Sequence, residues 1–233
     1  MQSEKNKIEV ALYIVPTPIG NLEDITVRAI NVLKNVDIIA CEDTRRSGLL
    51  LKSLEISHSA QLHSYYDFNE ETKSVALIAQ ILNGKSVALI SDAGTPCISD
   101  PGYKLVNKAI EKGIKIISLP GATAFVPALV ASGFAVHSFT FLGFPPQKKG
   151  RSTFLKNALN SSNTVILYES SHRVLKLISE ISQIDNNRNI CIGREISKIF
   201  EEYIRFNTSD FAEEKIKITE KGEFVIIIQS AIG

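Results

Sequence analysis

Short apolar runs alternate along the chain with longer stretches in which apolar residues recur every three or four positions. The first pattern is typical of buried strands, and the second places apolar side chains on one face of a helix. In the first half, the predicted strands are 10–15, 37–41, 61–65, 86–90 and 114–119. The predicted helices are 22–36, 47–54, 70–83 and 103–112, and another begins near 120–124. Because parallel neighbouring strands need crossover connections, this order predicts a mainly parallel sheet covered by helices.

The pattern changes after about residue 125, where we expect a second α/β domain. Strands are predicted at 139–144, 164–168, 189–193, 202–206 and 223–229, with helices at 152–159 and 174–184. The last three strands indicate antiparallel pairing, and the basic segment Pro145 to Gly150 indicates a hairpin or flap. The expected architecture is therefore a two-domain α/β fold. Its N-terminal domain, 1–124, has a mainly parallel sheet, and its C-terminal domain, 125–233, has a mixed sheet with helices.

Loops rich in glycine and proline follow three of the predicted strands of the first domain. Their sequences are PTPIGN at 16–21, SDAGTPCISDPG at 91–102 and LPGATA at 119–124. Ligands of open α/β sheets bind outside the carboxyl ends of the strands, so the two loops at 16–21 and 91–102 predict one shared ligand. The alternative for the central loop is a simple connection in which Asp100 and Pro101 cap the next helix.

Composition and charge limit the possible partners. A net charge of +1 over 233 residues excludes a uniformly basic surface, so any RNA contact would be a local patch. Candidate patches are Arg45-Arg46 and Lys148-Lys149 with Arg151, and ordinary solvated surface is the alternative. The sequence has no long apolar stretch and no signal-peptide pattern, which indicates a cytoplasmic protein without a membrane partner. Its three cysteines lack CxxC spacing, so we expect reduced thiols and no metal site.

The common motifs of nucleotide hydrolysis, nicotinamide binding, zinc proteolysis and serine hydrolysis are absent. The four histidines, His58, His63, His137 and His172, are isolated in the sequence, and only His172 lies in a loop after a predicted strand. What remains is a site built from close-approach loops and backbone amides, with carboxylates at its rim. Such a site suits a small zwitterionic ligand, and S-adenosylmethionine is one that fits.

Seven segments in series resemble the ribosomal RNA small subunit methyltransferase I family, which is part of the tetrapyrrole-methylase superfamily. They are VPTPIGNLEDITVRAINVLKNVDIIACEDTRRSGLLL, SDAGTPCISDPG, LPGATA, GFPPQKKGR, LYESSHR, GREISKIFEE and KGEFV. The resemblance implies a two-domain methyltransferase, usually a homodimer, with S-adenosylmethionine in the cleft between the domains. It further implies 2′-O-methylation of a cytidine ribose in the decoding region of 16S rRNA, as naked rRNA or in the small ribosomal subunit.

Carried onto this sequence, the resemblance also implies which residues bind the cofactor. In the first domain they are Pro18, Asp92, Ala93, Gly94, Thr95, Ile98, Ser99, Ala122 and Thr123, and in the second they are Leu167 and Tyr168. One position departs from the family pattern. Where members commonly read His-Asn-Glu, this chain has Phe68-Asn69-Glu70, so a catalytic role for that histidine does not carry over.

Carboxylates at the strand ends are the candidates for a general base that takes the proton of the ribose hydroxyl. They are Glu42, Asp43 and Glu70, but Glu42 and Asp43 could instead pair with Arg45 or Arg46, and Glu70 could cap its helix. For RNA phosphates the candidates are Arg45, Lys148, Lys149 and Arg173. Two rival functions remain open: methylation of a tetrapyrrole macrocycle, and binding of S-adenosylmethionine without transfer.

Overall fold

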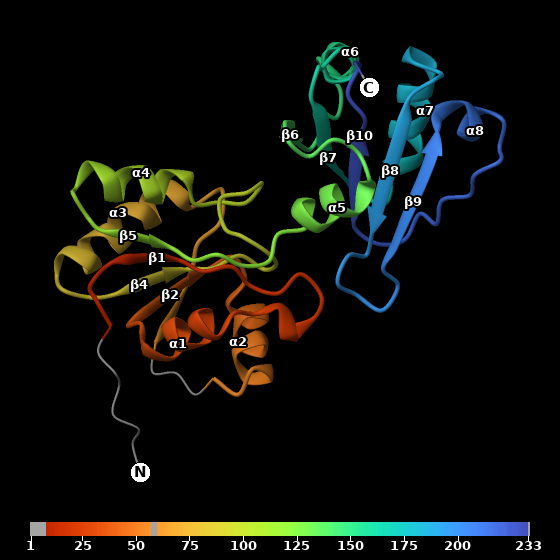
Figure 1. Ribbon diagram of the computed structural model, residues 1–233. Coiled ribbons are helices and arrows are strands. Elements are labelled where there is room, and N and C mark those ends of the chain that lie inside the picture. The colour runs from red at the N-terminus through yellow and green to blue at the C-terminus, as the bar shows by residue number, and fades with distance from the viewer. Residues whose placement is uncertain (1–7, 57–59, 233) are drawn as a thin grey trace. The chain divides into compact units, whose positions relative to one another are not determined.

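The computed structural model describes residues 8–56 and 60–232 and divides into two units, Met1–Thr123 and Ala124–Gly233 (Figure 1). Each unit contains one five-stranded sheet. Within the described ranges, no helix has the length and apolar character that a membrane span requires.

The sheet of the N-terminal unit is parallel throughout. Its strands are β1 (Leu12–Ile14), β2 (Ile38–Cys41), β3 (Gln61–Ser64), β4 (Val87–Leu89) and β5 (Ile116–Ser118). They are arranged in the order β3-β2-β4-β1-β5, so the first strand lies inside the sheet between β4 and β5. All five strands run the same way, and the loops that follow them therefore emerge at one edge.

Helices cover both faces of this sheet (Figure 1). They are α1 (Val27–Asn35), α2 (Thr44–Ser53), α3 (Glu70–Leu82) and α4 (Tyr103–Glu111), with a 3-10 turn at Leu22–Asp24. Alternate residues of β1 point to opposite faces: Tyr13 packs with α1 and α2, whereas Leu12 and Ile14 pack with α3 and α4. A strand buried on both faces reads as a continuous apolar run, which is why β1, β2 and β4 lack polar alternation.

The sheet of the C-terminal unit is mixed. Its strands are β6 (Phe139–Gly143), β7 (Thr164–Glu169), β8 (Asn189–Arg194), β9 (Glu202–Asn207) and β10 (Phe224–Ile228), in the order β6-β7-β10-β8-β9. Only β6 and β7 pair in parallel, and the other neighbours are antiparallel. The predicted fold class and the predicted antiparallel pairing at the end of the chain are therefore confirmed.

The helices of this unit are α5 (Phe125–Ser132), α6 (Arg151–Leu159), α7 (Val174–Ile184) and the short α8 (Thr208–Ala212). One core joins the apolar faces of α6 and α7 to inward residues of β7, β8 and β10. The sequence pattern did not predict α8. Its five residues are too few to show helical periodicity, but Asn207 and Asp210 form a capping box at its start.

Three local predictions were wrong, each because a polar side chain or a crossover sets a boundary. The helix expected over 22–36 begins only at Val27, because the Thr26 hydroxyl accepts the Ala29 N–H, and Asn21 caps the preceding 3-10 turn instead. The helix expected at 47–54 begins at Thr44, because Asp43 caps it. The segment 145–150 is not a hairpin, because β6 and β7 are parallel and α6 connects them.

Candidate cofactor site at the carboxyl edge of the parallel sheet

The loops that follow β1, β4 and β5 are joined to one another by hydrogen bonds. The N–H of Thr17 donates to the Gly94 carbonyl at 2.9 Å, and the Gly94 N–H donates back to the Thr17 carbonyl at 3.0 Å. The Thr17 hydroxyl also donates to the Ser91 carbonyl at 3.1 Å. The Thr95 hydroxyl donates to the Ala122 carbonyl at 2.9 Å. The three loops thus form one connected backbone surface.

Glycine permits the close approach of these loops. A Cβ added to Gly121 would lie 2.5 Å from the Pro16 Cβ, and one added to Gly94 would lie 3.3 Å from Ile19 Cγ2. The first distance is shorter than real Cβ contacts, so a side chain at Gly121 would push the β5 loop away from the β1 loop. The glycine-rich composition of both loops follows from this packing.

The central loop, Ser91–Gly102, has a strained backbone near its C-terminal end. Cys97 and Ser99 have φ values of 71° and 62°, in the left-handed region that side chains disfavour. Each such residue costs on the order of 1–3 kcal/mol, and strain of this kind concentrates at ligand sites. Ile98, between them, is 36% exposed. The loop therefore presents Ile98 and the exposed Ser99 outward at an energetic cost that the surrounding contacts must offset.

Four carboxylates, Glu42, Asp67, Asp92 and Asp100, lie near one another where β2, β3 and β4 end. Burial, followed by the negative charge of Asp92, raises the pKa of Glu42 above its usual value. Burial, with the charge of Glu42 next in importance, raises the pKa of Asp100 to about 6. The negative charges of Asp92 and Asp67 also contribute to both shifts. The cluster is therefore a region of strong negative potential at the edge of the sheet.

Asp92 carries an oxygen without a hydrogen bond. Its Oδ2 accepts a hydrogen bond from Arg46 Nη1 at 2.9 Å, while its buried Oδ1 has no hydrogen-bond partner among the described residues. Buried polar atoms nearly always have a partner, so this oxygen is available to a ligand hydroxyl or ammonium group.

Asp43, a candidate base, is occupied by the helix that it caps. Its Oδ1 accepts the Arg45 N–H at 2.8 Å, and its Oδ2 accepts from Arg45 Nη2 at 2.8 Å. The Arg45 guanidinium lowers the pKa of Asp43 well below the usual range, which makes this carboxylate a weak base. The pairing that was the alternative interpretation of Asp43 is thus present in the structure.

Glu70, another candidate base, is buried and makes hydrogen bonds inside the N-terminal unit. Its Oε1 accepts from the Tyr65 hydroxyl at 3.0 Å, the Gly102 N–H at 2.9 Å and the Lys104 N–H at 3.2 Å. The side chain of the neighbouring Phe68 is 99% exposed on the turn before α3. Of the three candidate bases, Glu42 alone belongs to the carboxylate cluster, since Asp43 and Glu70 have other partners.

In the C-terminal unit, the two predicted cofactor contacts have different surroundings. The Leu167 side chain is fully buried in the core between the sheet and its helices. The Tyr168 ring lies on the opposite face, 5.1 Å from the Phe141 centroid and 5.6 Å from that of Phe144, both edge-on. Phe125 extends this aromatic group by stacking on Phe141 at 4.9 Å. Within the C-terminal unit, therefore, the side chain of Leu167 is not accessible to a ligand.

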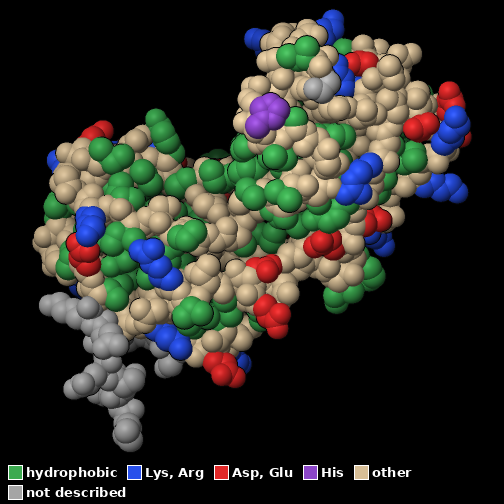
Figure 2. Space-filling view, in the orientation of Figure 1, with side chains coloured by type: hydrophobic (Ala, Val, Ile, Leu, Met, Phe, Trp, Pro, Cys, Tyr) green, Lys and Arg blue, Asp and Glu red, His purple; other side chains and the backbone are tan. Residues whose placement is uncertain are grey.

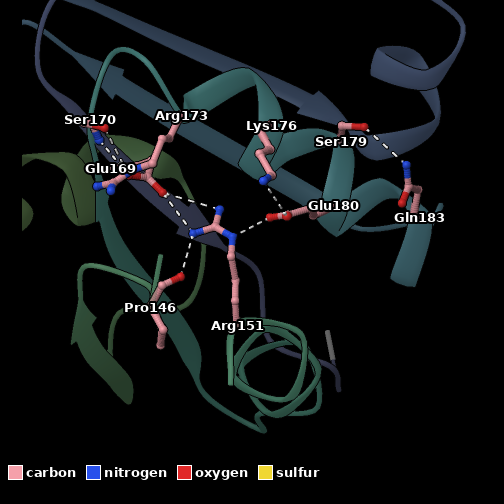
Figure 3. Close-up of polar contacts among 9 residues, drawn as sticks. All are labelled: Pro146, Arg151, Glu169, Ser170, Arg173, Lys176, Ser179, Glu180 and Gln183. Atoms are coloured by element: carbon pink, nitrogen blue, oxygen red, sulfur yellow. Dashed lines mark hydrogen bonds and ion pairs between the residues drawn. The ribbon is translucent and has the colours of Figure 1, made fainter. Parts of the chain in front are cut away.

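Arg173, a candidate RNA contact of the C-terminal unit, belongs to a network of ion pairs (Figure 3). The fully buried Glu169 accepts from Arg173 Nε at 2.8 Å and lies 3.4 Å from Arg151 Nη1. Arg151 also donates to Glu180 Oε2 at 2.7 Å and to the Pro146 carbonyl at 3.1 Å. Arg151 is thus part of the interior rather than of a basic surface patch, which corrects the sequence-based interpretation. The pairs fix the segment 145–150 against α7.

The exposed cations among the candidate RNA contacts lie in separate parts of the described chain. Lys148 and Lys149 are exposed, and the Arg45 side chain is 88% exposed although it pairs with Asp43. On the face shown in Figure 2, Lys and Arg side chains are dispersed among Asp and Glu. Of the isolated histidines, His63 lies on β3, His137 and His172 are exposed, and His58 lies outside the described residues. The cysteines Cys41, Cys97 and Cys191 are free.

The match to a protein family defines the class of this molecule. The family of tetrapyrrole (corrin/porphyrin) methylases matches residues 11–212, which is most of both units. Solved structures of such enzymes share the fold. Cobalt precorrin-4 methyltransferase aligns with a TM-score of 0.66 at 17% identity, covering 96% of each chain. Uroporphyrin-III C-methyltransferase from Thermus thermophilus, complexed with S-adenosylhomocysteine, aligns with a TM-score of 0.62 at 18% identity, covering 95% of this chain and 98% of that one.

Closer relatives identify the group within that class. A ribosomal RNA small subunit methyltransferase I from Hydrogenobaculum sp. is 49% identical over 93% of this chain and 94% of its own length. Proteins of the same name from Halalkalibacterium halodurans and Pasteurella multocida are 46% and 43% identical over 94% and 97% of this chain, and over 75% and 82% of their own lengths. The chain belongs to the ribosomal RNA small subunit methyltransferase I family of tetrapyrrole methylases. It is accordingly an S-adenosylmethionine-dependent methyltransferase.

The edge of the parallel sheet has the chemistry that this methyl donor requires. S-adenosylmethionine carries a sulfonium and an ammonium cation, an uncharged ribose diol and one carboxylate. The carboxylate cluster favours the two cations, and the buried Asp92 Oδ1 lacks the hydrogen bond that an ammonium or hydroxyl group can donate. The residues of the N-terminal unit therefore fit the cofactor.

Two members of the carboxylate cluster, Asp67 and Asp100, were missed by sequence reasoning. Asp100 lies in the loop that was singled out, but it was interpreted only as a helix cap. In the structure, the N-cap of α4 is Gly102 instead. The available signal was that acidic residues follow three of the predicted strands, at Glu42, Asp67 and Asp92–Asp100. Since parallel strands end at one edge, these acidic residues could have been expected to lie together.

Replacing Asp100 by asparagine is expected to stabilise the protein at neutral pH. The pKa of Asp100 is raised in the folded state to about 6, from an ordinary value of 3.8. The folded state therefore binds the proton more tightly, and the stability linked to this group is complete below about pH 4 and is lost as the pH rises through 6. Melting temperatures of Asp100→Asn and wild type at pH 4 and pH 7.5 test this. If the melting temperatures of the variant and wild type differ by the same amount at the two pH values, this prediction is contradicted.

Proposed function

We propose that the protein transfers a methyl group from S-adenosylmethionine to the 2′-hydroxyl of a cytidine ribose in the decoding region of 16S rRNA. The observation that carries the proposal is the identity of 43–49% with proteins named ribosomal RNA small subunit methyltransferase I, over nearly all of this chain. The solved tetrapyrrole methyltransferases are under 20% identical and support the fold alone.

The proposed cofactor contacts combine both units. From the N-terminal unit, the connected loops contribute Pro18, Asp92, Ala93, Gly94, Thr95, Ile98, Ser99, Ala122 and Thr123. Of these, Ala93, Ile98 and Ser99 are exposed, whereas Pro18 and Gly94 are buried and would act through the backbone. From the C-terminal unit, Tyr168 would contribute its ring or backbone, and Leu167 its backbone only. As the resemblance implies, residues of both domains, 1–124 and 125–233, would bind the cofactor.

When bound, S-adenosylmethionine supplies a methyl group activated by a good leaving group, so the protein's main task is to align the ribose oxygen with the methyl carbon. Rigid loops suit this task, because pre-aligned reactants can remove several kcal/mol or more from a barrier. Glu42 is the proposed base for the hydroxyl proton, because its raised pKa makes its carboxylate more basic than an exposed one. The strong pairing of Asp43 with Arg45 makes Asp43 the weaker candidate.

The proposed RNA contacts are Arg45, Lys148, Lys149 and Arg173, acting on phosphates. Lys148 and Lys149 are exposed on the segment that Arg151 fixes through the Pro146 carbonyl. Arg173 pairs with Glu169 through Nε, and its side chain is 28% exposed. We further propose that the protein acts as a homodimer, as the resemblance implies, and that it does so in the cytoplasm.

The proposed function is tested by transfer of tritiated methyl from S-adenosylmethionine to small ribosomal subunits and to naked 16S rRNA, both prepared from a strain that lacks this gene. Label in a cytidine ribose of the decoding region is the expected result, and the two substrates show which form is used. No label in either substrate would contradict the proposal. A protein that still binds the cofactor and methylates a tetrapyrrole would instead be a tetrapyrrole methyltransferase.

Replacing both Lys148 and Lys149 by glutamine is expected to weaken RNA binding and to lower its salt dependence. Each lost phosphate contact reduces the slope of log affinity against log salt concentration by about 0.7–0.9. The measurement is RNA affinity at several salt concentrations for the variant and wild type. A double variant of the exposed Lys215 and Lys217 gives the same charge change elsewhere in the C-terminal unit. Equal slopes for all three proteins would remove these lysines from the RNA interface.

A further inference from the structure

A single buried carboxylate, that of Glu70, connects the end of the Ser91–Gly102 loop to Tyr65, which follows β3. Glu70 lies in the first turn of α3, and its side chain is about 10% exposed. Its Oε1 accepts hydrogen bonds from the Gly102 and Lys104 N–H groups, 32 and 34 residues further along the chain. The Tyr65 hydroxyl, just after β3, also donates to this oxygen and lies 3.0 Å from Ser74 Oγ. One oxygen thus joins the end of β3, α3 and the start of α4.

The N-terminus of α4 needs such a partner. Gly102 is the N-cap residue of this helix and has no side chain that could accept its first N–H groups. Helix N-termini leave four N–H groups without helical acceptors, and a carboxylate there is favoured by the helix dipole. Glu70 therefore supplies, from another helix, the cap that the local sequence of α4 lacks.

Close packing requires glycine at residue 102. With φ of 144°, Gly102 lies in the region that side chains disfavour, and an added Cβ would be 2.4 Å from Cys97 Sγ and 2.8 Å from Leu89 Cδ2. The residue that Glu70 fixes is thus in contact with Cys97, where the strained part of the loop begins. Hydrogen bonds from Thr17 and Thr95 fix the other end of the loop.

We propose that Glu70 is a positioning residue, which holds the strained segment Cys97–Ser99 in the conformation that binds the methyl donor, and that it is not the general base. This inference rests on the proposed binding of S-adenosylmethionine by this loop. Oε1 accepts three hydrogen bonds within the protein, and Oε2 lies 3.9 Å from Lys104 Nζ, so both oxygens of this buried side chain have partners in the N-terminal unit. The side chain therefore acts as an acceptor for the α4 amides rather than as a free base.

That distinction makes the two roles separable by substitution. Glutamine keeps a carbonyl oxygen in the place of Oε1, so Glu70→Gln is expected to keep S-adenosylmethionine KM and kcat within about threefold of wild type. Alanine removes the acceptor, and a lost hydrogen bond to a charged group costs enough to change an equilibrium by about tenfold or more. For Glu70→Ala, we therefore expect the KM and dissociation constant for S-adenosylmethionine to rise about tenfold or more, with kcat reduced far less.

Glu71→Gln is the matched control. Glu71 is the next residue on α3, is 63% exposed and pairs with Lys108 and Lys104, so its variant has the same charge change without the loop contacts. We expect it to resemble wild type. Tyr65→Phe removes one donor to Glu70 but leaves both backbone donors, and is expected to change the dissociation constant by a few-fold at most.

Amide hydrogen exchange gives a readout that does not depend on catalysis. Without any ligand, the Gly102 and Lys104 amides should exchange faster in Glu70→Ala than in wild type, while β1 and β4 stay protected.

A Glu70→Gln enzyme whose kcat falls by 10²–10⁴-fold at unchanged KM would overturn the inference and make Glu70 a base. Wild-type cofactor affinity in Glu70→Ala would also overturn it. If Glu70→Ala does not fold, the kcat and KM of Glu70→Gln and the dissociation constant of Tyr65→Phe still distinguish a positioning residue from a general base. A wild-type protein that binds no S-adenosylmethionine contradicts the proposed function itself.

Discussion

Replacing Glu169 by alanine is expected to reduce the free energy of unfolding of the C-terminal unit by about 3 kcal/mol or more. The reason is that Arg151 and Glu169 form a buried ion pair with side-chain exposures of 7% and 0%. Removing Glu169 takes one of two carboxylate partners from the buried Arg151 and also removes the carboxylate that pairs with Arg173. Arg151 keeps Glu180 and the Pro146 carbonyl as acceptors, which places the expected loss at the lower end of the range for buried pairs.

The measurement is thermal and denaturant unfolding, together with hydrogen exchange that reports on each unit. A loss of this size should lower the melting temperature by about 10 °C, and faster exchange should be confined to β7, α6 and α7. Glu213→Ala is the control. Glu213 pairs with Lys215 at the surface, both more than half exposed, and its removal should change stability by no more than about 0.5 kcal/mol. A melting temperature of Glu169→Ala within 1 °C of wild type would show that the network contributes little.

Replacing Gly102 by valine is expected to reduce S-adenosylmethionine affinity by 100-fold or more. Valine at φ of 144° is strained by on the order of 1–3 kcal/mol. Its Cβ would in addition overlap Cys97 Sγ and Leu89 Cδ2, and Leu89 is only 1% exposed and cannot move freely. The simplest relief is displacement of the Ser91–Gly102 loop, which would also lengthen the hydrogen bond from Gly102 to Glu70. Since tenfold corresponds to 1.4 kcal/mol, about 3 kcal/mol of combined cost gives the expected factor.

The measurement is calorimetric titration with S-adenosylmethionine, after far-ultraviolet circular dichroism has shown that the fold is kept. Gly113→Val is the matched control, because Gly113 also has a positive φ, of 65°, but no atom lies within 4 Å of its added Cβ. Valine at residue 113 therefore has the backbone strain of a positive φ but no overlap with neighbouring atoms. Residue 113 follows the C-terminal end of α4, whereas Gly102 precedes its N-terminal end. The control should bind the cofactor as wild type does. Equal affinities for Gly102→Val and wild type would exclude this loop from the cofactor site.

The alternation of apolar runs and helical stripes determined the elements and the class of fold. Continuous apolar runs such as Ile38–Cys41 belong to strands buried on both faces, and only a sheet covered by two helical layers provides that environment. Glycine and proline marked the loops that form the carboxyl edge, because Gly121 permits an approach to Pro16 that a Cβ atom would block. These signals are local, and they can therefore be recognised in one sequence.

Element boundaries were predicted less well, because single polar side chains set them. Thr26 and Asp43 begin their helices by accepting one N–H each, and neither bond follows from the periodicity of apolar residues. The short helix α8 was missed for the same reason.

The roles of the charged residues were decided by the tertiary structure. The sequence placed Asp43, Glu42 and Glu70 as equivalent carboxylates after strands. Asp43 pairs with Arg45, only two residues away, whereas long-range packing gave Glu42 a cluster of acidic neighbours and Glu70 the amides of a distant helix. Arg151 and Lys149 are close in sequence, yet one is buried against Glu169 and the other is exposed. The sequence alone determines which chemical groups are available and near which strand end. Burial, charge and hydrogen-bond partners depend on residues tens of positions away, so only the folded structure decides which group is free to react.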